Sequence, residues 1–166
     1  MLTDAREPAA IEPTANFISA LIERLESTHE GNRELDCQLA YVIGYGIEGM
    51  GVSFRGYCHL HGLNWSDIAR EANAYQSILS HALPRFTTSS DTMLAQIGKL
   101  PDWRVMAMGE GPDMHPRPAD FAYDGSWFVR LHSPSLRKLQ FASAPFLPMA
   151  LCIAYLRAFQ TSAGAE

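Results

Sequence analysis

The sequence predicts an α+β fold, in which a mainly antiparallel sheet is sandwiched by helices and is preceded by an N-terminal helical hairpin. Three observations predict this class. Two apolar stripes of helical period occupy residues 14–44, strand-like segments lie between residues 103 and 142, and a strongly apolar segment follows at 145–159. Helical and strand-like patterns that occupy separate stretches of a chain are typical of α+β domains.

The size of the chain suits one domain with a hydrophobic core of its own. It has 166 residues, of which 47% are hydrophobic, and its formal net charge is −5. We expect a flexible leader at 1–13, a single domain at 14–160 and a tail at 161–166. The negative charge argues against sequence-independent binding to nucleic acid or to an anionic membrane, although it does not describe how the charges are distributed.

The cysteines and the apolar segments indicate in which cellular compartment the protein is expected. Cys37, Cys58 and Cys152 are odd in number and scattered, so they do not resemble a disulfide framework. No run approaches the roughly 18 apolar residues of a transmembrane helix. The first residues also lack the apolar core of a signal peptide. These features favour the reducing cytoplasm and predict no membrane association.

The helical hairpin is expected over residues 14–44. Thr14 is a suitable N-cap, and the apolar residues that follow recur at three- and four-residue spacing. Gly31 and Asn32 interrupt this stripe, and a second helix is expected from Arg33 to the glycines that begin at Gly44. Two helices joined by so short a connection are typical of a helical hairpin.

Residues 45–84 are interpreted as a candidate insertion. Residues 52–58 alternate weakly, so we expect either a strand or an ordered loop there. Ser66 then resembles an N-cap, and the apolar spacing beyond it predicts a helix that Pro84 ends.

Residues 85–160 carry the pattern helix, three strands, helix. Ser89 or Ser90 is expected to cap a helix that Pro101 ends, and residues 103–108 alternate as in a half-buried strand. Asp124 and Gly125 form a strong hairpin signal before a strand at 127–131, and a further strand is expected at 136–142. The last helix, expected at 145–159, is apolar on nearly all sides and should be covered on most of them.

Several of these segments resemble a known group of proteins. They are residues 21–26 (LIERLE), 33–36 (RELD), 86–91 (FTTSSD), 103–105 (WRV) and 148–157 (PMALCIAYLR). With these motifs, residues 20–44 and 85–158 are similar to small uncharacterised phage and prophage proteins related to the phage ABA sandwich domain. The resemblance implies an antiparallel sheet packed by helices and a phage or prophage origin. It assigns no catalytic or binding residue.

The leading functional hypothesis is a non-enzymatic accessory protein that acts by binding. Trp127 and Phe128 are neighbours in a predicted strand, so they point to opposite faces, and one of them needs cover from another element, a partner or a ligand. Asp113, His115 and Arg117 lie in a loop rich in Gly and Pro, and such loops commonly carry recognition. We expect a host or defence protein, a small ligand or a second copy as partner, in the cytoplasm of a bacterial host cell, and no cofactor. An anti-defence role fits the resemblance by association.

A metal site is the alternative. Cys58, His59 and His61 are clustered, and His81 follows twenty residues after His61. Cysteine and histidine are ordinary zinc ligands, so a small zinc-dependent enzyme or a metal-binding protein would be centred on Cys58 and His61. The absence of a second ligand pair at finger-like spacing weighs against it.

Nucleic-acid binding is the third hypothesis. The order helix, three strands, helix invites comparison with double-stranded RNA-binding domains, an analogy of topology alone. Arg130, Arg137 and Lys138 lie close together along the chain, but the net charge and the apolar start of the last helix disfavour this function.

Overall fold

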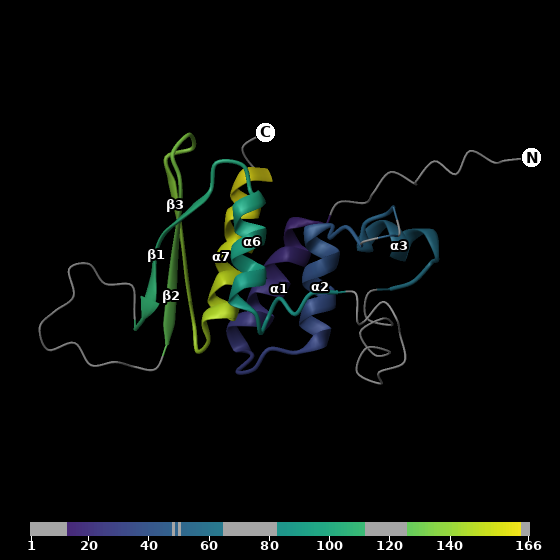
Figure 1. Cartoon of the computed structure of the whole chain (residues 1–166), viewed down its shortest axis with the longest axis horizontal. Coiled ribbons are helices and arrows are strands. Elements are labelled where there is room, and N and C mark those ends of the chain that lie inside the picture. Colours follow the sequence, from purple (N-terminus) through teal and green to yellow (C-terminus); the bar gives the residue numbers. More distant parts are fainter. Residues whose placement is uncertain (1–12, 48, 50, 65–82, 112–125, 164–166) are drawn as a thin grey trace, which may run out of the picture. The chain divides into compact units, whose positions relative to one another are not determined.

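The computed structural model describes residues 13–47, 49, 51–64, 83–111 and 126–163 (Figure 1). It confirms the α+β class with an antiparallel sheet. The described residues form five helices and three strands: α1 (Ala15–Ser27), α2 (Arg33–Ile43), α3 (Phe54–Leu60), α6 (Ser90–Lys99), β1 (Arg104–Glu110), β2 (Trp127–Ser133), β3 (Lys138–Ala144) and α7 (Leu147–Ala163).

The chain divides into two compact units. Residues 1–17 and 32–85 form the helical unit, which contains α2 and α3, whereas residues 18–31 and 86–166 form the sheet unit. Both helices of the expected N-terminal hairpin are present. Most of α1 groups with the sheet unit, while α2 groups with the helical unit.

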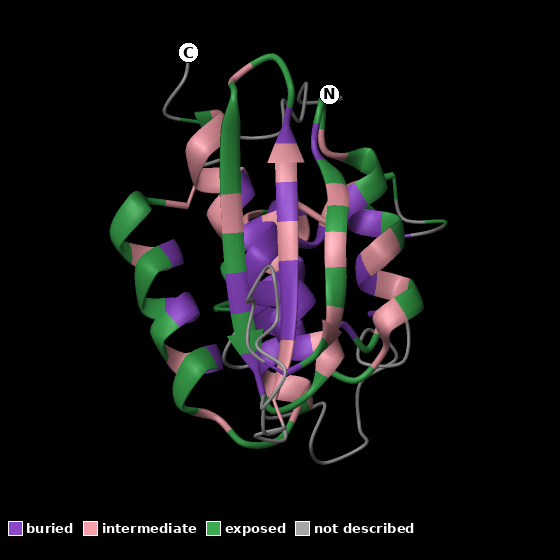
Figure 2. Ribbon diagram, turned by 90° about the vertical axis from the view of Figure 1, so that its left-hand side faces the viewer, coloured by how far each residue is buried: buried purple, intermediate pink, exposed green. Residues whose placement is uncertain are grey.

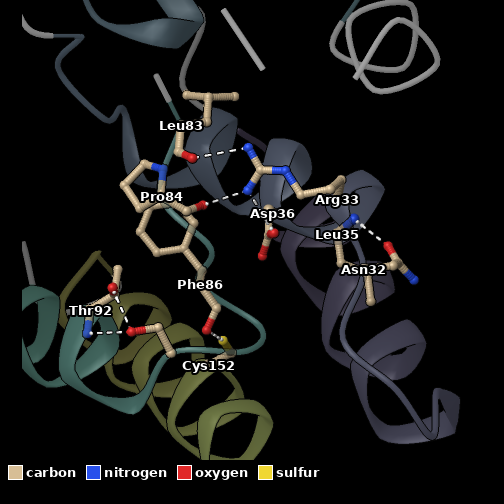
Figure 3. Close-up of polar contacts among 10 residues, drawn as sticks. Asn32, Arg33, Leu35, Asp36, Leu83, Pro84, Phe86, Thr92 and Cys152 are labelled. Carbon is tan, nitrogen blue, oxygen red and sulfur yellow. Dashed lines mark hydrogen bonds and ion pairs between the residues drawn. The ribbon is translucent and has the colours of Figure 1, made fainter. Parts of the chain in front are cut away.

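In the helical unit, polar side chains fix both ends of α2. The Asn32 side chain accepts a hydrogen bond from the backbone N–H of Leu35 at 2.8 Å, which caps the first turn. Arg33 donates to the carbonyl oxygens of Leu83 at 3.0 Å and Pro84 at 3.2 Å, so it holds a segment fifty residues away against the start of the helix (Figure 3). Gly44 ends α2 in the left-handed conformation, at φ 68°.

The structure corrects the expectation for residues 52–58, where a helix replaces the predicted strand or loop. Ser53 caps α3 by accepting a hydrogen bond from the N–H of Gly56 at 3.0 Å. The buried Arg55 of this helix donates to the carbonyl oxygens of Tyr41 at 3.0 Å and Val42 at 2.8 Å. These carbonyls belong to the last turn of α2, where acceptors lack intrahelical partners. Weak alternation misled the prediction because the cap and this long-range contact decide the local structure.

In the sheet unit, the three strands follow the order β1-β2-β3 and are antiparallel, which confirms the predicted helix–three strands–helix order of 85–160. Strands β2 and β3 pair in regular register from Trp127 opposite Ala144 to Ser133 opposite Lys138. The register of β1 against β2 shifts between Val105 and Ala107, as in a β-bulge. The predicted hairpin at 124–125 lies outside the described residues.

Helices α6 and α7 of this unit pack on one side of the sheet (Figures 1 and 2). Helix α7 packs against β2 and β3, and α6 packs against α7 and β1. Helix α7 continues to Ala163, beyond the expected end at 159 and into the expected tail. Two hydrogen bonds anchor this last part: Gln140 of β3 donates to the Thr161 hydroxyl at 2.7 Å, and the Trp103 indole donates to the Ser162 hydroxyl at 2.8 Å.

Residues 86–88 are packed closely in the sheet unit. A side chain at Gly31 would place its Cβ 2.5 Å from the carbonyl oxygen of Thr87, so only glycine fits there. The Cys152 thiol of α7 donates to the carbonyl oxygen of Phe86 at 3.4 Å (Figure 3). Phe86 is fully buried. Phe86 and Thr87 are therefore part of the core.

Candidate functional site

The two faces of the sheet differ in what they contact. The inner face is the side that packs on α7, as the bond from Gln140 to Thr161 shows. Leu131 is paired with Gln140 and is fully buried, and Val129, Ala142 and Ala144 share its side by strand alternation. The outer face is the opposite side, and its residues on β2 and β3 are Phe128, Arg130, His132, Leu139, Phe141 and Ser143.

The outer face carries large apolar side chains that remain open to solvent. Leu139 is 42% exposed and Phe141 is 47% exposed, although both lie within a regular strand pair. On the edge strand β1, Met106 at the bulge is 57% exposed, whereas the exposed Met108 pairs with Val129 and so lies on the inner side. Figure 2 shows the outer side of the sheet toward the viewer, with exposed and intermediate residues along β1 and with exposed and buried residues along β3. Clustered exposed apolar residues of this kind mark interaction surfaces.

A cation is held against the exposed aromatic ring. Arg130 is paired with Phe141 across the strands, and its guanidinium carbon lies 5.7 Å from the centre of the Phe141 ring. This is the geometry of a cation–π contact. Arg130 is half-buried, so its charge remains in reach of solvent. The pair presents a flat aromatic surface and a positive charge side by side.

Trp127 and Phe128 occupy opposite faces, as strand alternation requires. Trp127 pairs with the buried Ala144 and is half-buried on the inner face. Phe128 lies on the outer face, but only 8% of it is exposed. The exposed aromatic residue of the outer face is instead Phe141, which the sequence analysis did not single out. Its signal was available, since Leu139 and Phe141 alternate with Gln140 and Ala142.

The candidate loop residues Asp113, His115 and Arg117 lie outside the described residues. The binding role expected of them therefore stays a prediction.

The candidate metal ligands that the structure describes point to different partners. His59 shares a hydrogen bond of 3.3 Å with the Tyr41 hydroxyl, and the His61 ring packs on Tyr57 with 4.3 Å between ring centres. Cys58 is buried. Within the described part of the chain, no three His, Cys, Asp or Glu side chains are placed to hold a metal ion, and His81 lies outside it.

The two cysteines of the helical unit are poor nucleophiles. Burial raises the pKa of Cys58 to about 11, and the nearby Cys37 adds to that rise. Burial likewise raises the pKa of Cys37 to about 11, despite the opposing effect of Arg33. A thiol with so high a pKa is protonated at neutral pH, whereas nucleophilic attack needs the thiolate.

Asp102 organises the end of the sheet where β2 turns into β3. Its carboxylate accepts hydrogen bonds from the hydroxyls of Ser135 and Ser133 and from the backbone N–H of Ser135, the last two at 2.7 and 2.8 Å. These bonds, with a smaller contribution from Arg104, hold the pKa of Asp102 below its ordinary value. A carboxylate stabilised in its charged form is a poor general base, so we assign it a structural role.

In the described residues, no helix is both long enough and apolar enough to cross a membrane. Comparison of the chain with protein-family models found no match, and comparisons with curated proteins and with solved structures found none either.

Proposed function

We propose that this chain is a non-enzymatic binding protein and that the outer face of its sheet is the binding surface. The observation that carries the proposal is the exposure of Phe141 and Leu139 on strand β3 of a sheet whose inner face is packed. Leaving such side chains in water costs about 1.5–3 kcal/mol each relative to full burial, and a partner that covers them recovers part of this.

The chemistry of the described residues supports binding better than catalysis. The buried thiols Cys37 and Cys58 have pKa values near 11. The carboxylate of Asp102 is engaged by two serines. The resemblance to phage ABA sandwich proteins favours an accessory role in a phage or prophage, acting in the cytoplasm of the host cell. That origin and that location stay predictions.

Affinity capture with matched variants tests the proposal. The double variant Leu139→Ser, Phe141→Ser removes the apolar character of the outer face. Phe146→Ser is the control, because Phe146 is equally exposed, at 51%, but lies between β3 and α7 rather than on the outer face. We expect the control to retain the captured partners, or the self-association measured by light scattering, and the double variant to lose them.

If the double variant keeps every partner and the same oligomeric state as the parent chain, the outer face is not the binding surface. Far-UV circular dichroism must first show that all three proteins are folded. Because the substituted side chains are exposed, we expect their thermal midpoints to agree closely.

A further inference from the structure

The positive charges of the sheet are concentrated although the chain as a whole is acidic. Residues 102–110 and 127–144 contain four basic residues and two carboxylates, a net charge of +2, in a chain whose net charge is −5. Of these carboxylates, Asp102 is bound by Ser133 and Ser135. The basic residues are Arg104, Arg130, Arg137 and Lys138.

The strand register places two of these charges beside planar side chains on the outer face. His132 pairs with Arg104 on one side and with Leu139 on the other, so the three form one row across the sheet. The next row contains Arg130 and Phe141, the cation–π pair. Lys138 is paired with Ser133 and alternates with Leu139, so it lies on the inner side at the end of β3, and Arg137 precedes it in the turn.

We infer that the outer face binds single-stranded nucleic acid, with Phe141 and His132 as surfaces on which bases stack. Arg104 and Arg130 would contact phosphates or stack through the guanidinium plane. The inference rests on the proposed function and names its partner. Unpaired bases stack on Phe, His and Arg side chains, and a positive surface follows the backbone.

The complementarity of charge and shape favours this partner over a protein. An apolar protein surface would suit Leu139, but it gives no role to the cations that lie beside the rings. A duplex would fit less well, because its bases are already stacked on one another and are not available to Phe141. Residues 112–125 are not part of the proposed site.

Fluorescence anisotropy with labelled oligonucleotides tests the inference on the full chain. The probes are an RNA and a DNA single strand of about 20 nucleotides, longer than the roughly 4–16 that one small domain covers, and a DNA duplex of the same length. We expect both single strands to bind more tightly than the duplex. With about two phosphate contacts, affinity should fall about sevenfold between about 50 and about 200 mM salt.

Two pairs of variants locate the site. Phe141→Ala should weaken binding about tenfold, in the range measured for removal of a stacking ring, whereas Phe146→Ala should leave it unchanged. Arg104→Gln removes a positive charge from the outer face, and Lys138→Gln, at an exposed position on the inner side of the same sheet, is its control. We expect Arg104→Gln alone to make the salt dependence less steep.

The inference fails if no single strand binds at low salt, or if Phe141→Ala and Phe146→Ala bind equally. It also fails if the duplex is preferred. A failure here leaves the proposed function standing when partner capture still depends on Leu139 and Phe141, and a protein partner for the outer face is then the result. If capture is also independent of these residues, both proposals are wrong.

Discussion

The inner and outer faces of the three-stranded sheet differ in how far their side chains are buried. On the inner face, Val129 and Leu131 are fully buried, and the polar Gln140 is satisfied by Thr161 of α7. On the outer face, the residues that alternate with them include Arg130 and the exposed Phe141. Because both faces share the same backbone, this difference in burial indicates that the stabilising contacts are concentrated on the inner face. The outer face is left open for the proposed recognition.

The largest expected effect separates two leucines on neighbouring strands. Leu131→Ala should lower the free energy of unfolding by about 2–5 kcal/mol, because it opens a cavity in the packed inner face. Leu139→Ala, on the outer face, should change it by about 0.5 kcal/mol or less, as is usual for exposed positions. Urea denaturation of both variants measures the difference. Similar losses in the two would mean that the outer face is also part of a core.

A smaller effect should come from the bond that joins the indole of Trp103 to α7. Ser162→Ala removes the acceptor of the Trp103 N–H, and Trp103 is only 4% exposed, so we expect a loss of about 1 kcal/mol. Ser143→Ala is the matched control, because Ser143 is exposed on the outer face. Thermal unfolding followed by tryptophan fluorescence measures both. If Ser143→Ala lost as much stability as Ser162→Ala, the exposed outer face would contribute as much stability as the bond of the buried Trp103, and the two faces would not differ in this respect.

The smallest effect depends on pH and concerns Asp102. Its pKa is lowered in the folded protein from an ordinary value of 3.8, so the charged form contributes stability above that value. This contribution is lost as the pH falls through the lower folded pKa. Asp102→Asn should therefore reduce the thermal midpoint slightly at pH 7, and the difference from the parent chain should shrink below about pH 4.

An NMR titration of the Asp102 carboxyl provides the direct check. In Ser135→Ala the pKa should move up toward 3.8, because the Ser135 hydroxyl is the strongest of its stabilising donors. An unchanged pKa in that variant would show that the hydrogen bond does not hold the charge.

The sequence predicted what depends on local pattern. The order of helix, three strands and helix from 85 to 160 followed from alternation and caps, and Ser89 does cap α6 through the N–H of Thr92 at 3.3 Å. The short helix α3 was missed because its stability depends on Arg55 reaching the carbonyls of α2, a contact that no local pattern reveals. The end of α7 was placed too early, since Gln140 and Trp103, which bond to Thr161 and Ser162, lie at least twenty residues away.

For the candidate site, the sequence predicted that an aromatic residue of the sheet would need cover, but it did not predict which residue. Alternation showed that Trp127 and Phe128 must face opposite ways, and the structure agrees, but it buries Phe128. Which aromatic ring stays exposed depends on what covers each face, and sequence alone does not give this. Alternation with Gln140 and Ala142 set Phe141 apart in the sequence, but its contact with the cross-strand partner Arg130 is seen only in the structure.

Arg157 of α7 affects whether the sheet edge can pair with a strand of another copy. Its guanidinium donates to the carbonyl oxygen of Phe141 and also pairs with Glu26. An incoming strand that sought to extend the sheet at β3 would have to displace this ion pair to reach that acceptor, and at the other edge it would meet the irregular register of β1. Both edges of the sheet therefore hinder the addition of a further strand, which is the step by which exposed sheets extend into fibrils.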